Sequence, residues 1–446
     1  MCREAAIALL LVVSTGCAHA PQKVSASLTT ASLPASWAAP VTESAEVPDL
    51  WRLVTDGRVR DLMAAALERN PNLAQTSLRV AEAEALLNGQ RGLLWPALDM
   101  RGQSRATRSD GRTVESGLAG ASVSWEADLW GRLRSSTSAA AERLNASEAD
   151  LLAARNSLAA SVLRTLLELT FSRAIIEVEE RRIKTLQLNE QLIRERYLVG
   201  LGALADLEAA RTTLAQAGAG LLDRQERYSR GVRALRVLAG DYSLEPGLTS
   251  RFAVELPGSA VPIAVLRARP DIAAAMARAS AANADADAAA KALLPGVSLS
   301  LDQTRSASSI GNALSADGVS VLLLGVTAPL FQGGRLRAER SRTELVAEHQ
   351  LFALREALLQ ALREVDDAVV LEESLKLQTE QRALAQRFSR DNRTLFESRY
   401  RDGIANIFDL LNAQQTAYDA EVQLLNAQLL QNQNRVDLGL ALGLGL

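Results

Sequence analysis

The sequence has few aromatic residues, few histidines and cysteines, and no excess of charge of either sign. Phe, Trp and Tyr make up 4% of its 446 residues, which is low for a large globular core but ordinary for long helices rich in Ala and Leu. Its two His, His19 and His349, and its two Cys are too few for a typical catalytic zinc site or for Cys/His catalysis. A net charge of −3 argues against a nucleic-acid-binding protein, which usually has a strong basic excess.

Motifs of catalysis are absent from the sequence as well. It contains no phosphate-binding loop, no nucleophile elbow and no zinc-binding motif. Asp285 and Asp287 lack the remaining ligands of a calcium loop, so we interpret them as part of a solvated helix face. We therefore expect neither an enzyme nor a metal site, and no cofactor beyond a covalent lipid on Cys17.

The N-terminus has the features of an export signal. The apolar run Ala5 to Val13 is shorter than the ~20 residues that cross a bilayer as a helix, but it has the length of a signal-peptide core. The residues that follow, Val13-Ser14-Thr15-Gly16-Cys17, resemble a bacterial lipoprotein box. We predict a signal peptide over residues 1–16 and a lipid, such as palmitate, on Cys17. A plain secretory leader with an incidental Cys is the alternative.

A tether follows the predicted lipidation site. Residues 17–61 are rich in Ala, Ser, Thr and Pro up to about Asp49, a composition that favours an extended segment because each Pro blocks helix formation. Position 18 is Ala, and within the lipoprotein resemblance this implies sorting to the outer membrane.

The rest of the chain is a tandem duplication. Asn70-Pro71-Asn72 matches Arg269-Pro270-Asp271, and Gly131-Arg132-Leu133-Arg134 matches Gly334-Arg335-Leu336-Arg337. These matches define a first repeat over residues 62–240, a linker over 241–260 and a second repeat over 261–446. The repeats differ by four residues, and the difference corresponds to residues 98–131 of the first repeat.

Each repeat predicts the same order of elements. Period-2 alternation predicts strands at 98–103, 119–129 and 297–302, and the fourth strand, 319–330, is apolar on both faces. Polar loops are predicted between the paired strands, at 107–116 and 306–318. Helices are predicted at 72–92, 132–197, 204–238, 270–292, 335–400 and 407–440. We expect the shorter return helix of each repeat to stack end to end with the helix that precedes its strands.

Four strands are too few to close a barrel, since the smallest outer-membrane barrels need ~8. Open sheet edges are costly in lipid, so we expect several copies to share one barrel. The number of strands alone is compatible with two copies or with three, and only three copies give room for a lumen. Three tryptophans lie near the ends of predicted strands: Trp95, Trp125 and Trp130. They form an aromatic belt at the membrane interface in one interpretation and are ordinary core residues in the other.

Several motifs resemble the TolC-like outer-membrane efflux proteins. They are Leu266 to Ala275, Lys291 to Pro295 and Pro329 to Arg335, while Trp51-Arg52-Leu53 and Asn70 to Leu73 resemble the lipoprotein branch that serves RND-type pumps. The resemblance implies a mainly α-helical homotrimer, with a 12-stranded β-barrel and a long α-helical barrel that extends into the periplasm. It also implies passive export of drugs or other small solutes, delivered by an inner-membrane pump through a periplasmic adaptor.

In such proteins the turns between long and short helices form the periplasmic tip, which contacts the adaptor and narrows the pore. The matching residues are Tyr197, Gly200, Asp206, Tyr400, Arg401, Gly403, Asp409 and Asn412. The resemblance suggests that Asp206 pairs with Tyr400 to hold the tip shut. Arg401 is the candidate replacement for a family arginine that is Ala405 here, and Asn412 stands where a second acidic residue is usual. The alternative interpretation treats Asp206 and Asp409 as charges favoured at a helix N-terminus.

Two further alternatives remain open from the sequence. A secreted or periplasmic coiled-coil scaffold or adaptor without a pore would explain the helices but not the alternating strands.

Arginines recur every third residue in one helix, and we interpret them as a solvated stripe with intersubunit ion pairs rather than as a ligand site. They are Arg224, Arg227, Arg230, Arg233 and Arg236.

Overall fold

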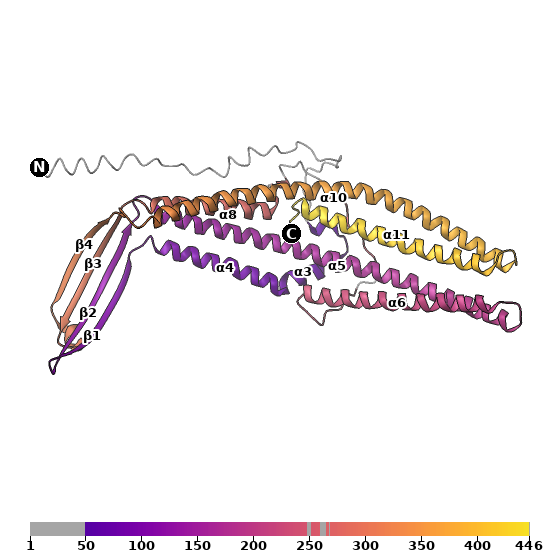
Figure 1. The fold of residues 1–446 in the computed structure, drawn as a ribbon, viewed down its shortest axis with the longest axis horizontal. Helices are drawn as coiled ribbons and strands as arrows, with labels where there is room; N and C mark the ends of the chain where they lie inside the picture. Colours follow the sequence, from indigo (N-terminus) through magenta and orange to yellow (C-terminus); the bar gives the residue numbers. More distant parts are fainter. Residues whose placement is uncertain (1–49, 248–250, 259–264, 267, 446) are drawn as a thin grey trace. The chain divides into compact units, whose positions relative to one another are not determined.

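A computed structural model describes residues 50–247, 251–258, 265–266 and 268–445. The protein is mainly helical (Figure 1). In chain order the elements are η2 (Leu50–Leu53), α3 (Gly57–Arg69), α4 (Pro71–Gly92), β1 (Ala97–Ser109), β2 (Arg112–Ala127), α5 (Arg132–Leu198), α6 (Leu204–Leu238), α8 (Pro270–Lys291), β3 (Gly296–Ala307), α9 (Ile310–Ser315), β4 (Gly318–Thr327), α10 (Arg335–Arg401) and α11 (Ile407–Ala441). No helix in the described ranges combines the length and the apolar content that a membrane crossing requires.

The order helix, strand, strand, long helix, shorter helix occurs twice, which confirms the duplicated pattern of elements. Neither long helix contains Pro or Gly, so nothing in the sequence interrupts the backbone hydrogen bonds of α5 or α10. The six predicted helices are present with ends within a residue or two of those expected. Helix α3 was not predicted, because its short apolar pattern follows directly on the Pro-rich segment.

The described chain forms two compact units, and each repeat contributes to both. The sheet unit comprises Ala81–Ser147 and Ala274–Glu356, and the helix unit comprises the described parts of Leu33–Val80, Glu148–Ala273 and Ala357–Leu446. The compact units are therefore different from the sequence repeats.

The sheet unit contains one antiparallel sheet with strand order β1-β2-β3-β4. The pairing of β2 with β3 joins the two repeats, with Val123 opposite Leu301. Strands β1 and β4 are its edges, and no other described strand pairs with them. Both outer edges therefore have unpaired backbone groups in a single subunit.

The register confirms the predicted alternation. One row across the four strands is apolar and consists of Leu98, Val123, Leu301 and Leu322. The next row, on the opposite face, consists of Asp99, Ser122, Asp302 and Val321. One face of the sheet is thus largely apolar and the other largely polar, except on β4, which is apolar on both faces as expected.

Both connections between paired strands lie within the predicted segments, but the first is much shorter than predicted. Strands β1 and β2 continue to a two-residue turn at Asp110 and Gly111, whose φ angles of 52° and 77° are those of a type I′ hairpin turn. The polar residues of this hairpin concealed the strands, because they do not alternate with apolar ones. In the second repeat the connection lies within the predicted segment and contains the short helix α9. Most of the extra length of that repeat lies after β4, because seven residues separate β4 from α10 and only four separate β2 from α5.

The helix unit has a core built by α3, α5, α6, α10 and α11. Leu163, Leu166 and Leu167 of α5 are fully buried there, together with Leu235 of α6 and Leu438 of α11. Each fully buried leucine contributes about 1.5–3 kcal/mol of transfer free energy. This core fixes the packing of the helices whose far ends form the two turns described below.

Equivalent junctions join the last helix of each repeat to the helix that precedes its strands. The Asn70 side chain donates a 2.8 Å hydrogen bond to the carbonyl of Leu238, and Arg269 donates one of 2.9 Å to the carbonyl of Ala441. These bonds satisfy carbonyls at the C-termini of α6 and α11, which have no partner within the helix. They confirm the predicted end-to-end stacking.

The glycine that ends α6 provides a test of this junction. Gly240 has a φ of 66°, and a Cβ atom built there would lie 2.3 Å from the carbonyl oxygen of Arg69. We expect Gly240→Ala to lower the free energy of unfolding by at least about 2 kcal/mol, because it adds both backbone strain and a steric clash. The measurement is a denaturant or thermal unfolding curve.

The matched control is Gly220→Ala in the interior of α6. A Cβ atom there meets nothing within 4 Å, so we expect a stabilisation of about 0.5–1 kcal/mol from the better helix former. A Gly240→Ala protein as stable as the wild type would contradict the close approach.

Candidate functional site

The turns α5–α6 and α10–α11 lie at the same end of the helix unit (Figure 1). Gly200 and Gly403 each have a φ of 75°, a left-handed conformation that glycine adopts without strain. The N–H of Leu201 donates to the carbonyl of Arg196, and that of Ile404 to the carbonyl of Arg399, both at 2.8 Å. Both turns are thus Schellman motifs that close the long helices in the same way.

The shorter helices begin differently in the two repeats. Asn406 caps α11, and its side-chain oxygen accepts a 2.9 Å hydrogen bond from the N–H of Asp409. The equivalent residue in α6 is Ala203, which has no side-chain cap. Asp206 and Asp409 both lie in the first turn of their helices, where the positive end of the helix dipole favours a carboxylate.

Tyr400 links the two helix hairpins. Arg196 Nη1 donates a 3.0 Å hydrogen bond to the Tyr400 hydroxyl, and its guanidinium carbon lies 6.0 Å from the centre of the ring. The expected pairing of Asp206 with Tyr400 is therefore wrong for this subunit, and Asp206 has no side-chain hydrogen bond or ion pair with any described residue. The sequence analysis did not predict Arg196 as the partner of Tyr400, because it took that partner, Asp206, from the resemblance to the family.

The remaining candidate residues take less specific positions. Arg401 Nε donates a 3.2 Å bond to the carbonyl of Glu397 in its own helix. Asn412 is exposed, and the hydroxyl of Tyr197 has no described hydrogen bond. Leu411 packs against a small cluster that includes Ile193, whereas Phe408 stays exposed.

Apolar side chains around the two turns are exposed to an unusual degree. We call this set the turn surface, and it consists of Leu198, Val199, Leu201, Leu204, Ile404 and Phe408. Leu198, Leu201 and Ile404 are 72–75% exposed. A group of exposed apolar residues of this kind typically marks a protein interaction site.

Polar pairs between α5 and α11 hold the helices behind the turns in register. Asn189 donates a 2.6 Å bond to Gln414, and Thr185 lies 2.8 Å from the Tyr418 hydroxyl. Arg182 donates a 3.0 Å bond to Asp419. Such pairs fix the axial position of two helices, because a shift by one residue would leave buried polar groups unpaired.

Comparisons with known proteins agree with this geometry. The profile of the outer membrane efflux protein family matches residues 62–241 and 261–444. The chain belongs to the outer membrane efflux protein family. It is an outer-membrane component of an efflux system, as its motifs predicted.

Individual relatives cover nearly the whole chain. The pyoverdine export outer membrane protein OpmQ of Pseudomonas putida is 30% identical over 433 residues, covering 92% of each chain. The cation efflux system protein CusC of Escherichia coli K12 is 25% identical, covering 89% of this chain and 88% of CusC. The open-state structure of the MtrE channel of Neisseria gonorrhoeae has a TM-score of 0.81 at 26% identity, covering 92% of this chain and 95% of MtrE.

The arginine stripe of this efflux protein is fully paired within the subunit. Arg224 contacts Glu179 of α5 at 3.2 Å, and Arg230 contacts Glu226 at 2.6 Å. Arg227, Arg233 and Arg236 have carboxylate partners as well. The stripe is therefore ion-paired within one subunit, and the predicted intersubunit pairs stay a prediction.

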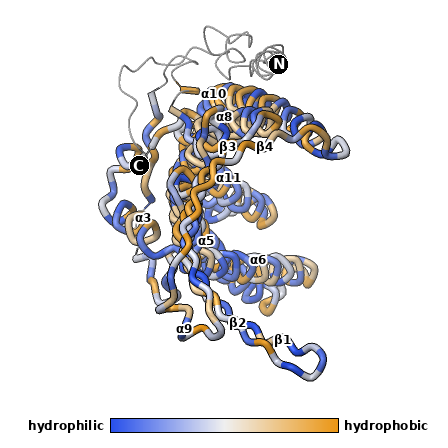
Figure 2. Tube along the Cα trace, turned by 90° about the vertical axis from the view of Figure 1, so that its left-hand side faces the viewer, coloured by the Kyte–Doolittle hydropathy of each residue, from blue (hydrophilic) through white to orange (hydrophobic). Residues whose placement is uncertain are grey.

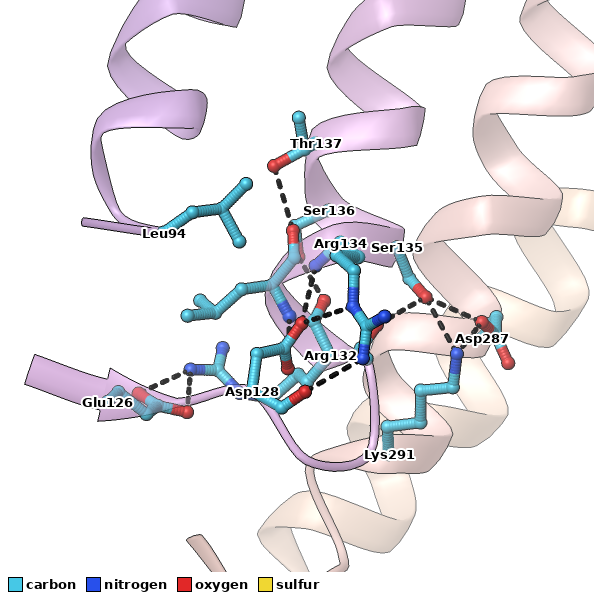
Figure 3. Close-up of polar contacts among 12 residues, drawn as sticks. Leu94, Glu126, Asp128, Arg132, Arg134, Ser135, Ser136, Thr137, Asp287 and Lys291 are labelled. Carbon is cyan, nitrogen blue, oxygen red and sulfur yellow. Dashed lines mark hydrogen bonds and ion pairs between the residues drawn. The ribbon is translucent and has the colours of Figure 1, made fainter. Parts of the chain in front are cut away.

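A second polar cluster lies in the sheet unit, where β2 leads into α5 (Figure 3). Asp128 accepts hydrogen bonds from the backbone N–H groups of Leu133 and Arg134, and so caps α5. Burial raises the pKa of Asp128, but these bonds and the Arg134 side chain outweigh it, and the net pKa is lowered. Trp125 and Trp130, at this end of the sheet, donate to the carbonyls of Leu94 and Pro295.

The interpretation of Asp285 and Asp287 as a solvated face is corrected. Asp285 pairs with Arg143, and Asp287 contacts Ser135 and Lys291 (Figure 3). Burial raises the pKa of Asp285 despite the nearby arginine. No group of three potential metal ligands comes together in the described ranges. Cys17 lies outside the described residues.

The Arg269 motif has a measurable electrostatic role. Its guanidinium is buried and binds Asp271 at 3.1 and 2.6 Å and Glu364 at 2.8 Å. Burial by itself raises the pKa of Asp271, but the Arg269 hydrogen bonds and charge lower it overall. The pKa of Asp271 is lower in the folded state than in the unfolded state. The pair therefore stabilises the fold fully at a pH above the ordinary Asp pKa, and this stabilisation is lost as the pH falls through the lowered pKa.

We expect Asp271→Asn to lower the free energy of unfolding by about 1–2 kcal/mol at pH 7, because it removes a charge-assisted pair. The difference from the wild type should begin to shrink as the pH falls below about 4 and should continue to shrink toward the lowered folded-state pKa, because protonation of the wild-type carboxylate removes the same charge. Unfolding curves between pH 3 and pH 7 measure it. Asp367→Asn, in an exposed pair with Arg363, is the control and should cost only a few tenths of a kcal/mol. A pH-independent difference would contradict the assignment.

Proposed function

We propose that this protein is the outer-membrane duct of a tripartite efflux system and lets drugs or other small solutes pass passively from the periplasm to the outside. The observation that carries this proposal is the four-stranded sheet with one apolar face and two unpaired edges. Every unpaired backbone group in lipid costs several kcal/mol, so the edges require pairing with other subunits.

The closed assembly that we propose is a homotrimer with a 12-stranded barrel. Joining β4 of one subunit to β1 of the next pairs every edge. Two subunits would give eight strands and an interior filled by side chains, whereas twelve strands leave an open lumen. The apolar face, with Leu98, Val123 and Leu301, would face lipid, and the polar face would line the lumen.

The partners of the duct are a periplasmic adaptor and an inner-membrane pump of the RND type. The turn surface supports an adaptor contact, because it exposes apolar side chains at the end of the helix unit. By name, OpmQ exports pyoverdine and CusC belongs to a cation efflux system, so relatives of similar identity differ in cargo.

We also propose a lipid on Cys17 that anchors the chain to the outer membrane, with residues 17–61 as the tether. The lipoprotein box supports this, and the described residues do not include it. The protein would then be lipid-anchored and would extend into the periplasm through its helices.

Gating at the turns would depend on contacts between the two helix hairpins. The Arg196–Tyr400 hydrogen bond joins α5 to α10 and opposes their separation. Three copies of Asp409 around one axis would attract cations, and Asn412 would leave that ring with fewer charges than two acidic positions provide.

Removing the link between the hairpins tests this function. We expect Tyr400→Phe and Arg196→Gln each to raise the conductance of the purified protein in planar bilayers several-fold, because a hydrogen bond that holds the tip narrow, worth about 1 kcal/mol, is lost. Tyr242→Phe is the control, since its hydroxyl has no described hydrogen bond and it lies after α6. An absence of channels in the wild type would contradict a duct.

A cellular test addresses export itself. Deletion of the gene should raise sensitivity to at least one toxic compound, and the wild-type protein should restore resistance. Unchanged sensitivity across all exported compounds tested would count against efflux and in favour of a scaffold without a pore.

A further inference from the structure

Charges on the polar face of the sheet are separated by sign along the strands. The register places Asp99 and Asp302 in one row of this face, nearer to the helices. Beyond that row, toward the β1–β2 turn, the charged residues of the same face are Arg101, Arg105 and Arg112. Figure 2 shows the turn end of β1 and β2 as hydrophilic, with few apolar positions.

None of these arginines is neutralised within the subunit. Arg101, Arg105 and Arg112 are exposed, and none has an ion pair or side-chain hydrogen bond with a described residue. The arginines of helix α6, by contrast, all have carboxylate partners. Unpaired cations on one face of a strand create a positive potential at that end of the face.

We propose that the outer end of the barrel lumen is an arginine ring that favours anionic solutes, formed by Arg101, Arg105 and Arg112 of each subunit. This inference rests on the proposed trimeric duct, in which the polar face lines the lumen. Solutes leaving the cell would pass the Asp99 and Asp302 row first and the arginines last. The ligand class is a carboxylated, phosphorylated or sulfated small molecule, since guanidinium groups bind such oxyanions by charge-assisted hydrogen bonds.

The size of the effect follows from the dimensions of the barrel. Twelve strands ~4.8 Å apart, tilted by ~40°, give a radius of about 12 Å. The Debye length is ~8 Å at 0.15 M salt and ~30 Å at 0.01 M. The ring is therefore largely screened at the axis in physiological salt and acts strongly in dilute salt, or on multivalent anions that approach the wall.

A blocking experiment tests the ring directly. Inositol hexakisphosphate serves as the probe and is added to either side of wild-type channels in planar bilayers, in 0.05 M and 0.5 M KCl. We expect it to reduce the conductance from one side only, and the half-blocking concentration to rise at least about threefold in the higher salt.

Two variants on the same strand form a matched pair. Arg105 lies on the polar face, and Arg108, three residues later, lies on the opposite face. We expect Arg105→Gln to raise the half-blocking concentration about twofold, and the Arg101→Gln and Arg105→Gln double variant about fivefold. The half-blocking concentration for Arg108→Gln should equal that for the wild type.

The outcomes separate this inference from the proposed duct. Normal conductance with equal block in the wild type and the double variant would overturn the arginine ring and leave the duct in place. An equal change in Arg105→Gln and Arg108→Gln would also overturn it, because the effect would then not depend on the face. If the wild type formed no channels at all, the duct and the ring would both fall.

Discussion

Strands at the edge of a sheet leave a row of N–H and C=O groups without partners, and β1 and β4 are both edges of this kind. The rest of the structure depends on how those groups are satisfied. In water they can bind solvent, but in the hydrocarbon around the proposed barrel they cannot, so the proposed assembly has to pair them. The pairing of β2 with β3 also matters, because it joins the two repeats into one sheet with only two edges.

The two repeats have the same backbone arrangement but different side-chain contacts at equivalent positions. Asn70 and Arg269 occupy equivalent positions, and both bind the terminal carbonyl of a helix, but only Arg269 also binds carboxylates. At the turns, the backbone hydrogen bonds are the same, whereas the side-chain contacts are not. Arg196 reaches Tyr400 of the other hairpin, while Arg399, its equivalent, lies over Phe396 of its own helix. The two repeats therefore share the backbone conformation of the turns, but their side-chain contacts at the turns are different.

Charge has different roles in the two units. In the helix unit most charged side chains are in ion pairs, many of them exposed, and such pairs add little stability individually. Pairs between different helices, such as Arg182 with Asp419, help to keep the helices in register. On the polar face of the sheet, Arg101 and Arg105 have no carboxylate partner within the subunit. They gain electrostatic stabilisation only if a solute or another subunit supplies an anion.

The sequence by itself determined the elements and their order, because those depend on local patterns. Long stretches without Pro or Gly set α5 and α10, alternation set most of the strands, and glycines set the turns between helices. The hairpin at Asp110 and Gly111 and the short helix α9 were not predictable in this way, since the hairpin residues are mostly polar without alternation and α9 has too few residues to show a period. Only the tertiary structure decided which distant side chains meet: Arg196 with Tyr400, Arg269 with Glu364, and Asp285 with Arg143. Such contacts depend on how helices rotate and slide against one another, and residues far apart in a chain leave no periodic signal of that.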